Sequence, residues 1–74
     1  MNNNLNRFLV RYYFKDKLLL DTTIEHWDQY VTALKASDTV TIKNQEFFVN
    51  KITMFHDESD KLKVILVVFV EPIN

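Results

Sequence analysis

The sequence predicts a single α+β domain in which one helix covers one face of a curved antiparallel sheet of about five strands. The chain has 74 residues, which is enough for one small domain and too few for two. Several stretches carry apolar residues at strand spacing, whereas one stretch carries them at helix spacing. No linker, repeat or low-complexity segment divides the chain. We therefore expect one domain over residues 6–74, behind a disordered tail at residues 1–5.

The first expected strand covers residues 7–15, where side chains of different character alternate. One side of this strand would carry Phe8, Val10, Tyr12 and Phe14, and the other side Arg7, Leu9, Arg11, Tyr13 and Lys15. A turn at residues 15–17 then leads into a second strand, residues 18–21. In that strand Leu18 and Leu20 share a face.

Apolar spacing changes from strand to helix periodicity after residue 21. Thr22 and Glu25 have the spacing of a capping box, in which two side chains satisfy free N–H groups at a helix start. One apolar stripe at helical spacing follows, formed by Trp27, Tyr30, Val31 and Leu34. These two signals predict a helix over about residues 24–36.

Three more strands are expected after the helix, which gives the order ββαβββ. The β-branched residues 39–42 favour a third strand, and a turn at residues 43–45 leads to a fourth over residues 46–56. Alternation breaks at Phe47 and Phe48 and again at Met54 and Phe55, which predicts a bulge or a strong bend at these places. A turn at residues 57–61 precedes the fifth strand, residues 62–71, which Pro72 ends.

The fifth strand is apolar on both faces, because every residue from Val64 to Val70 is apolar. One helix of about thirteen residues cannot cover both faces of a five-stranded sheet. The sheet could curl into a barrel-like interior filled by Phe47, Phe55 and Phe69. Alternatively, a second copy or a different protein could cover the outer face or pair with an edge, and a homodimer is the commonest such assembly.

Composition excludes several classes of function and favours a cytoplasmic protein. The chain has no cysteine and therefore no disulfide framework or thiolate metal site, and no glycine for a phosphate-binding loop. Its longest apolar run is far below the roughly 20 residues of a membrane span, and the net charge of −1 favours no polyanionic partner.

Catalytic and metal-binding signals are few. His26 and His56 are the only histidines, and the tract from His56 to Asp60 holds Ser59 among acidic residues. Residues this close in one turn rarely converge on a reacting atom, and the tract lacks the spacing of a calcium-binding loop. We expect a solvated acidic hairpin tip, no cofactor and no enzyme activity.

Two binding functions fit the pattern. The first is a protein interface on the second face of the fifth strand, formed by Ile65, Val67 and Phe69, with Tyr13 and the charged tip at residues 57–60 at its rim. The alternative is a single-stranded nucleic-acid platform on the first strand and its turn. Its cations and aromatic residue are Arg7, Arg11, Tyr13, Lys15 and Lys17.

The compact ββαβββ layout without glycine or cysteine resembles small accessory proteins encoded by bacteriophages and other mobile elements of Gram-positive bacteria. The resemblance covers architecture and composition across most of the chain, and no residue-specific motif carries it. Many such proteins inhibit or redirect a host protein by surface contact. The resemblance thus implies a small non-enzymatic protein that modulates a host protein.

Overall fold

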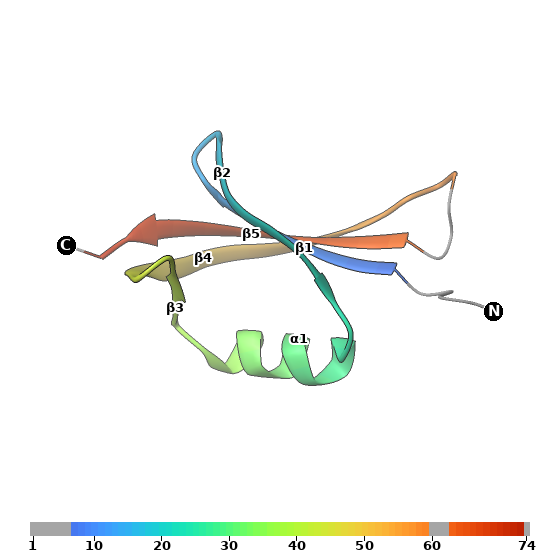
Figure 1. Cartoon of the computed structure of the whole chain (residues 1–74), viewed down its shortest axis with the longest axis horizontal. Coiled ribbons are helices and arrows are strands. Elements are labelled where there is room, and N and C mark those ends of the chain that lie inside the picture. The colour runs from blue at the N-terminus through green and yellow to red at the C-terminus, as the bar shows by residue number, and fades with distance from the viewer. Residues whose placement is uncertain (1–6, 60–62, 74) are drawn as a thin grey trace.

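The computed structural model describes residues 7–59 and 63–73, so the tail expected at residues 1–5 lies outside the described residues. The element order ββαβββ is confirmed, and the elements form one small domain with a curled sheet and a single helix (Figure 1). Their bounds are β1 Arg7–Phe14, β2 Lys17–Ile24, α1 Trp27–Ala36, β3 Thr39–Ile42, β4 Gln45–His56 and β5 Lys63–Pro72.

The sheet is mixed, which corrects the expectation of a purely antiparallel sheet. Its strand order is β2-β1-β5-β4-β3, and β1 and β5 lie side by side as a parallel pair. The other three pairs are antiparallel. The place of β5 between the sheet's other strands and beneath α1 explains why Leu66, Val68 and Val70 are buried. It does not explain the apolar residues Ile65, Val67 and Phe69 on the other face of the strand.

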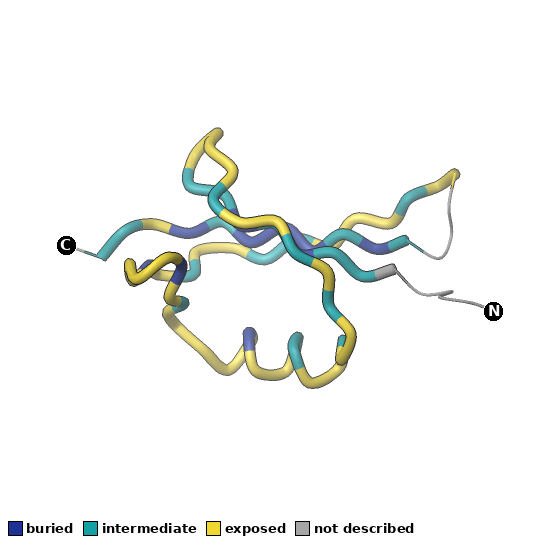
Figure 2. Tube along the Cα trace, in the orientation of Figure 1, coloured by how far each residue is buried: buried dark blue, intermediate teal, exposed yellow. Residues whose placement is uncertain are grey.

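The core lies between the sheet and α1, which crosses one face of the sheet (Figure 1). Val10 and Val68 are fully buried there, and Leu34 is the one buried residue of α1. Figure 2 shows the buried stretches concentrated in the central strands. Burying such side chains contributes about 1.5–3 kcal/mol each, so this helix-covered face supplies most of the driving force for folding.

The β1–β2 hairpin is longer than expected, because β2 continues to Ile24. Tyr12 pairs with Leu20 and Tyr13 pairs with Leu18, so Leu19 is an extra residue in β2 that forms a bulge. The bulge turns Leu19 toward the core, whereas Leu18 and Leu20 are 45% and 36% exposed. The expectation that Leu18 and Leu20 share a face is therefore wrong, because it assumed unbroken alternation.

The helix begins at Trp27 rather than near residue 24, and the capping box is wrong. Thr22 and Ile24 belong to β2, and the N-cap residue is His26, whose side chain makes no capping hydrogen bond. The apolar stripe is where the spacing predicted it: Trp27, Tyr30, Val31 and Leu34 all pack against the core. Trp27 stacks on Phe8 of β1 with ring centroids 4.5 Å apart, which fixes the first turn of α1 against the sheet.

The β3–β4 hairpin turns at Lys43 and Asn44, which both have positive φ angles, 51° and 66°. This is the backbone of the two-residue turns that match the twist of a hairpin. The bulge of β4 lies at Asn50, between Val49 and Lys51, and not at the two apolar pairs that predicted it. The apolar pair Phe47 and Phe48 therefore does not mark a bulge. The two side chains point to opposite faces of the sheet, and Phe47 is buried in the core while Phe48 is 49% exposed.

The barrel-like interior expected from three phenylalanines is wrong. Phe47 belongs to the core under α1, whereas Phe55 pairs with Ile65 and Phe69 pairs with Lys51 on the opposite face of the sheet. Pro72 ends β5 as expected, opposite Phe47. Leu62, predicted as the first residue of this strand, lies outside the described residues.

Candidate functional site

The second face of the sheet, which we call the open face, has no covering element among the residues that the structure describes (Figure 1). Strand register decides which side chains lie there, since paired residues point to the same side. Leu9 pairs with Ile65, and Ile65 pairs with Phe55 on its other edge. Tyr13 pairs with Phe69. The apolar residues of the open face are Leu9, Tyr13, Leu18, Phe48, Phe55, Ile65, Val67 and Phe69.

Aromatic side chains surround a shallow depression in the open face. The rings of Tyr13 and Phe69 have centroids 6.1 Å apart and are tilted by 32°. Phe55, which is 51% exposed, borders the same depression, and Val67 forms part of its lining. Its volume is about 350 Å³ and its rim includes Lys15 and Asp16. Aromatic residues around a small apolar centre are typical of binding surfaces rather than of a wet sheet face.

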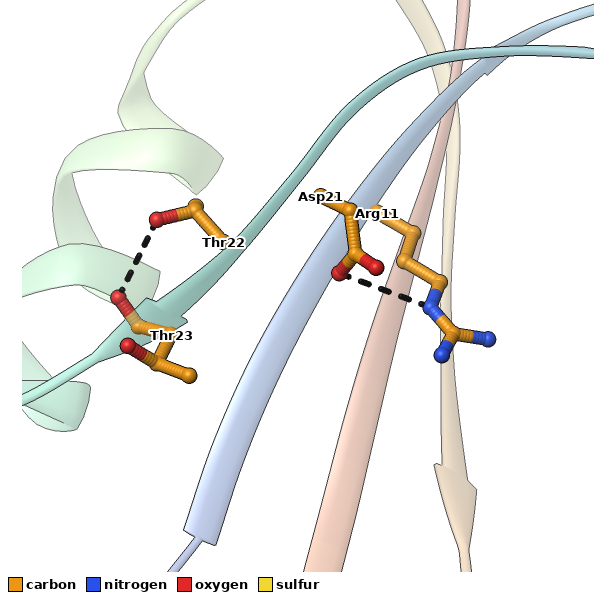
Figure 3. Close-up of polar contacts among 4 residues, drawn as sticks. All are labelled: Arg11, Asp21, Thr22 and Thr23. Carbon is orange, nitrogen blue, oxygen red and sulfur yellow. Dashed lines mark hydrogen bonds and ion pairs between the residues drawn. The ribbon is translucent and has the colours of Figure 1, made fainter.

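An ion pair borders the apolar part of the open face. Arg11 of β1 lies opposite Asp21 of β2, and its Nε is 3.5 Å from Oδ1 of Asp21 (Figure 3). The Nε is shielded from solvent and makes no hydrogen bond of good geometry, although 36% of the Arg11 side chain is exposed. Figure 3 also shows Thr22 of β2 donating to the carbonyl oxygen of Thr23, 3.4 Å away. Since Arg11 pairs with Val67 on its other side, its stem flanks the centre of the open face.

We expect Asp21→Asn to change the free energy of unfolding by less than about 1 kcal/mol, because both partners are more than one-third exposed. Urea unfolding of the two proteins at low and at high salt measures this change. The small difference should shrink further at high salt, since salt screens exposed charges. A decrease of about 3 kcal/mol or more in the free energy of unfolding would contradict the prediction, because only a buried ion pair is expected to cost that much when broken.

The four residues expected at a protein interface lie together. Ile65, Val67 and Phe69 are alternate residues of β5, and Tyr13 lies beside Phe69 on β1. Val67 is only 8% exposed, whereas Ile65 and Phe69 are half-buried, so the last two offer more contact area. Their role in binding stays a prediction. The tip expected at the rim extends to Asp60, which lies outside the described residues.

Sequence reasoning missed Phe55 and Leu9 as members of the open face. Phe55 reaches it because the extra residue Asn50 reverses the alternation of β4. The alternation placed Leu9 on the correct side of β1, but it does not predict that β5 pairs with β1 in parallel and sets Ile65 beside Leu9. The break in alternation along β4 was the available signal, although it did not locate the bulge.

The residues expected to bind nucleic acid are only partly gathered. Arg11 and Tyr13 lie on the open face, and Lys15 is in the turn, with its Nζ 5.4 Å from the centre of the Phe14 ring. Lys17 is exposed at the start of β2, and Arg7 begins β1. Arg11 is already paired with Asp21, so the open face presents fewer unpaired cations than β1 alone predicted.

The pKa of Tyr12 departs clearly from its ordinary value. Tyr12 lies under α1, 5% exposed, and its hydroxyl is hydrogen-bonded to that of Tyr30. Burial raises the pKa of Tyr12, and the hydrogen bond to Tyr30 raises the pKa further. This pair fastens α1 to β1 on the covered face, away from the open face.

The histidines and the acidic tip form no catalytic or metal arrangement in the described part of the chain. No group of three or more His, Asp and Glu side chains there has the geometry of a metal site. His26 precedes α1 and His56 ends β4, and both are exposed. Ser59 donates its N–H and its hydroxyl to Oδ1 of Asp57, at 2.9 and 2.7 Å, which is a local turn contact.

Within the described residues, α1 is too short and too polar to cross a membrane. Comparisons with protein-family models, curated proteins and solved structures find no match to this chain.

Proposed function

We propose that this protein is a non-enzymatic interaction module that binds another protein through the open face. The observation that carries the proposal is the Tyr13–Phe69 pair beside Phe55, on the side of the sheet that α1 does not cover. Monomeric proteins rarely leave such contiguous apolar area to water, and aromatic anchors dominate the energetics of protein interfaces. The ion pair of Arg11 with Asp21 supplies a polar rim.

The depression is too shallow and too poor in polar groups to favour a small-molecule site. Ligand pockets usually enclose most of the ligand and place several polar groups toward it. Here the polar side chains at the rim are Lys15 and Asp16, both exposed in the turn after β1. An apolar protein surface that fits over Phe69 would bury the same area without needing a closed cavity. The layout resembles small proteins of mobile elements that act on proteins of their host. We therefore propose that the partner of the open face is a protein of the host cell.

The test uses the double variant Tyr13→Ala, Phe69→Ala. A pull-down from a nuclease-treated bacterial lysate, compared with wild type by quantitative mass spectrometry, should show one or more proteins that wild type retains and the double variant loses. The control Leu20→Ala removes an exposed apolar side chain on the α1 side of β2 and should retain the same proteins. Far-UV circular dichroism and Trp27 fluorescence check that each variant is folded.

A hydrophobic dye gives a second readout that needs no partner. Folded wild type should bind such a dye saturably, because dyes of this class report exposed apolar surface. The double variant should lose most of this signal, whereas Leu20→Ala should keep it. Equal retention of lysate proteins and equal dye signals in wild type and double variant would contradict a binding role for the open face.

Single-stranded nucleic acid is the second candidate, and the Tyr13–Phe69 pair also favours it, because bases stack on neighbouring aromatic rings of a sheet face. Lys51 pairs with Phe69 and places a cation next to these rings. Fluorescence anisotropy with a labelled oligonucleotide at low salt tests it. Oligonucleotide binding that weakens with salt and disappears in the double variant would favour nucleic acid, rather than a protein, as the partner of the open face.

A further inference from the structure

Besides the open face, the outer edge of β4 beyond its bulge is a second surface without a partner among the described residues. β3 is short and pairs only with Gln45–Phe48. From Lys51 to His56, β4 has β5 along one edge and, among residues 7–59 and 63–73, no strand along the other. We call Lys51–His56 the β4 edge. An unpaired strand of this length is a template for another strand.

Hydrogen bonds on both sides of the bulge show which backbone groups point outward. Before the bulge, the N–H of Val49 donates to the carbonyl oxygen of Asp38, away from β5. After it, the N–H of Asp57 donates to the carbonyl oxygen of Lys63, toward β5. In an antiparallel strand, successive residues direct their N–H and C=O groups to opposite edges. Because Asp57 directs its N–H toward β5, every second residue before it, starting with His56, directs these groups away from β5. Those residues of the β4 edge are Ile52, Met54 and His56.

The β4 edge has few of the features that protect edge strands in monomers. It contains no proline, the bulge precedes it, and Lys51 at its start is its one residue with a permanent charge. Met54 and Phe55 are 44% and 51% exposed. The β2 edge at the other side of the sheet differs, because it carries a bulge at Leu19 and the charged Lys17 and Asp21. The two edges are therefore not equivalent as templates.

We propose that the β4 edge pairs antiparallel with the β4 edge of a second copy of this chain, about a two-fold axis at Thr53. Ile52 and Met54 then form hydrogen-bonded pairs with Met54 and Ile52 of the other copy, as their outward backbone groups require. Thr53 lies opposite Thr53, and Lys51 lies opposite Phe55. The product is one continuous ten-stranded sheet.

A second copy fits this edge because the strand is complementary to itself. No like charges meet in the register centred on Thr53, and the cation of Lys51 lies beside the exposed ring of Phe55. Threonine pairs and apolar pairs are among the favourable cross-strand pairs of antiparallel sheets. The net charge of −1 per chain adds little repulsion between copies.

The axis is perpendicular to the sheet, so both helices lie on one side of the dimer and both open faces on the other. The two candidate interfaces then form one double-sized surface. The dimer itself does not depend on what the open face binds, so its test needs no partner protein.

Cysteine cross-linking tests the register directly, because the chain has no cysteine of its own. Opposite residues in a non-hydrogen-bonded antiparallel pair have Cα atoms about 4.5 Å apart, within the range of disulfides. Thr53→Cys should therefore give mostly covalent dimer under mild oxidation. Thr23→Cys is the matched control, on the outer strand β2 and exposed, and should form little covalent dimer over the same time.

Light scattering and sedimentation of variants without cysteine complete the test. Wild type should have twice the chain mass, and Met54→Lys should weaken dimerisation about tenfold or more, since edge lysines block strand pairing. The control Leu20→Lys on β2 should remain dimeric, and so should the variant Tyr13→Ala, Phe69→Ala. Far-UV circular dichroism confirms that each variant is folded.

Three outcomes would overturn the β4 dimer. The first is a monomeric wild type, and the second is cross-linking of Thr53→Cys no faster than that of Thr23→Cys. The third is a dimer that survives Met54→Lys but dissociates in the variant Tyr13→Ala, Phe69→Ala, which would mean that two open faces pack on each other instead.

Discussion

Leu66→Ala is expected to lower the free energy of unfolding by about 2–5 kcal/mol, the usual cost of removing a large aliphatic side chain from a packed core. Leu66 is 1% exposed and lies on β5, between β1 and β4 and beneath α1. A domain of this size has a total stability of only about 5 kcal/mol or slightly more. The variant should therefore be partly unfolded in buffer at room temperature.

Urea unfolding measures this loss through the fluorescence of Trp27, the single tryptophan, which stacks on Phe8. Leu18→Ala is the matched control, since the same atoms are removed from a side chain that is 45% exposed. Its stability should stay within about 0.5 kcal/mol of wild type. Equal losses in the two variants would mean that β5 is not the centre of the core.

Stability is expected to fall steeply above pH of about 10, and Tyr12 is the cause. Burial raises the pKa of Tyr12 in the folded protein above the value of about 10 in an unfolded chain. Between these two pKa values the unfolded chain has released the phenolic proton while the folded protein still binds it. The free energy of unfolding therefore decreases as pH rises, by up to about 1.4 kcal/mol per pH unit.

Tyr12→Phe isolates this effect, because phenylalanine keeps the ring and removes the titrating hydroxyl. At neutral pH the variant should lose about 1 kcal/mol, the net contribution of the hydrogen bond between Tyr12 and Tyr30. Between pH of about 10 and 11.5 its stability should decrease less steeply than that of wild type. Urea unfolding by circular dichroism at several pH values gives both curves. Parallel curves would assign the alkaline loss to other groups.

Local patterns predicted the elements well, because each pattern depends only on neighbouring residues. The stripe from Trp27 to Leu34 and the alternation from Phe8 to Phe14 gave the helix and the first strand nearly complete. The helix start was wrong because a capping box was inferred from two residue types alone. Thr22 belongs to β2 and pairs with Val10 of β1, and this tertiary pairing overrides the local preference for a cap.

The site was less predictable than the fold, because alternation tells which residues share a face and not which strands are neighbours. Tyr13 and Phe69 are far apart in sequence, and only the parallel register of β1 with β5 brings their rings together. Phe55 joins them through a bulge at Asn50, a polar residue that no apolar pattern marks. Bulges reverse the face of every residue that follows, so one unplaced bulge misplaces half a strand.

The parallel pairing of β1 with β5 determines when the chain can fold during synthesis. β1 leaves the ribosome before β5, its inner neighbour in the sheet, because β2, α1, β3 and β4 lie between them in the sequence. The β1–β2 and β3–β4 hairpins can form early as local units, yet neither has a closed core without β5. The nascent chain thus holds the inner edge of β1 unpaired until β5 has left the ribosome, and the sheet can be completed only then.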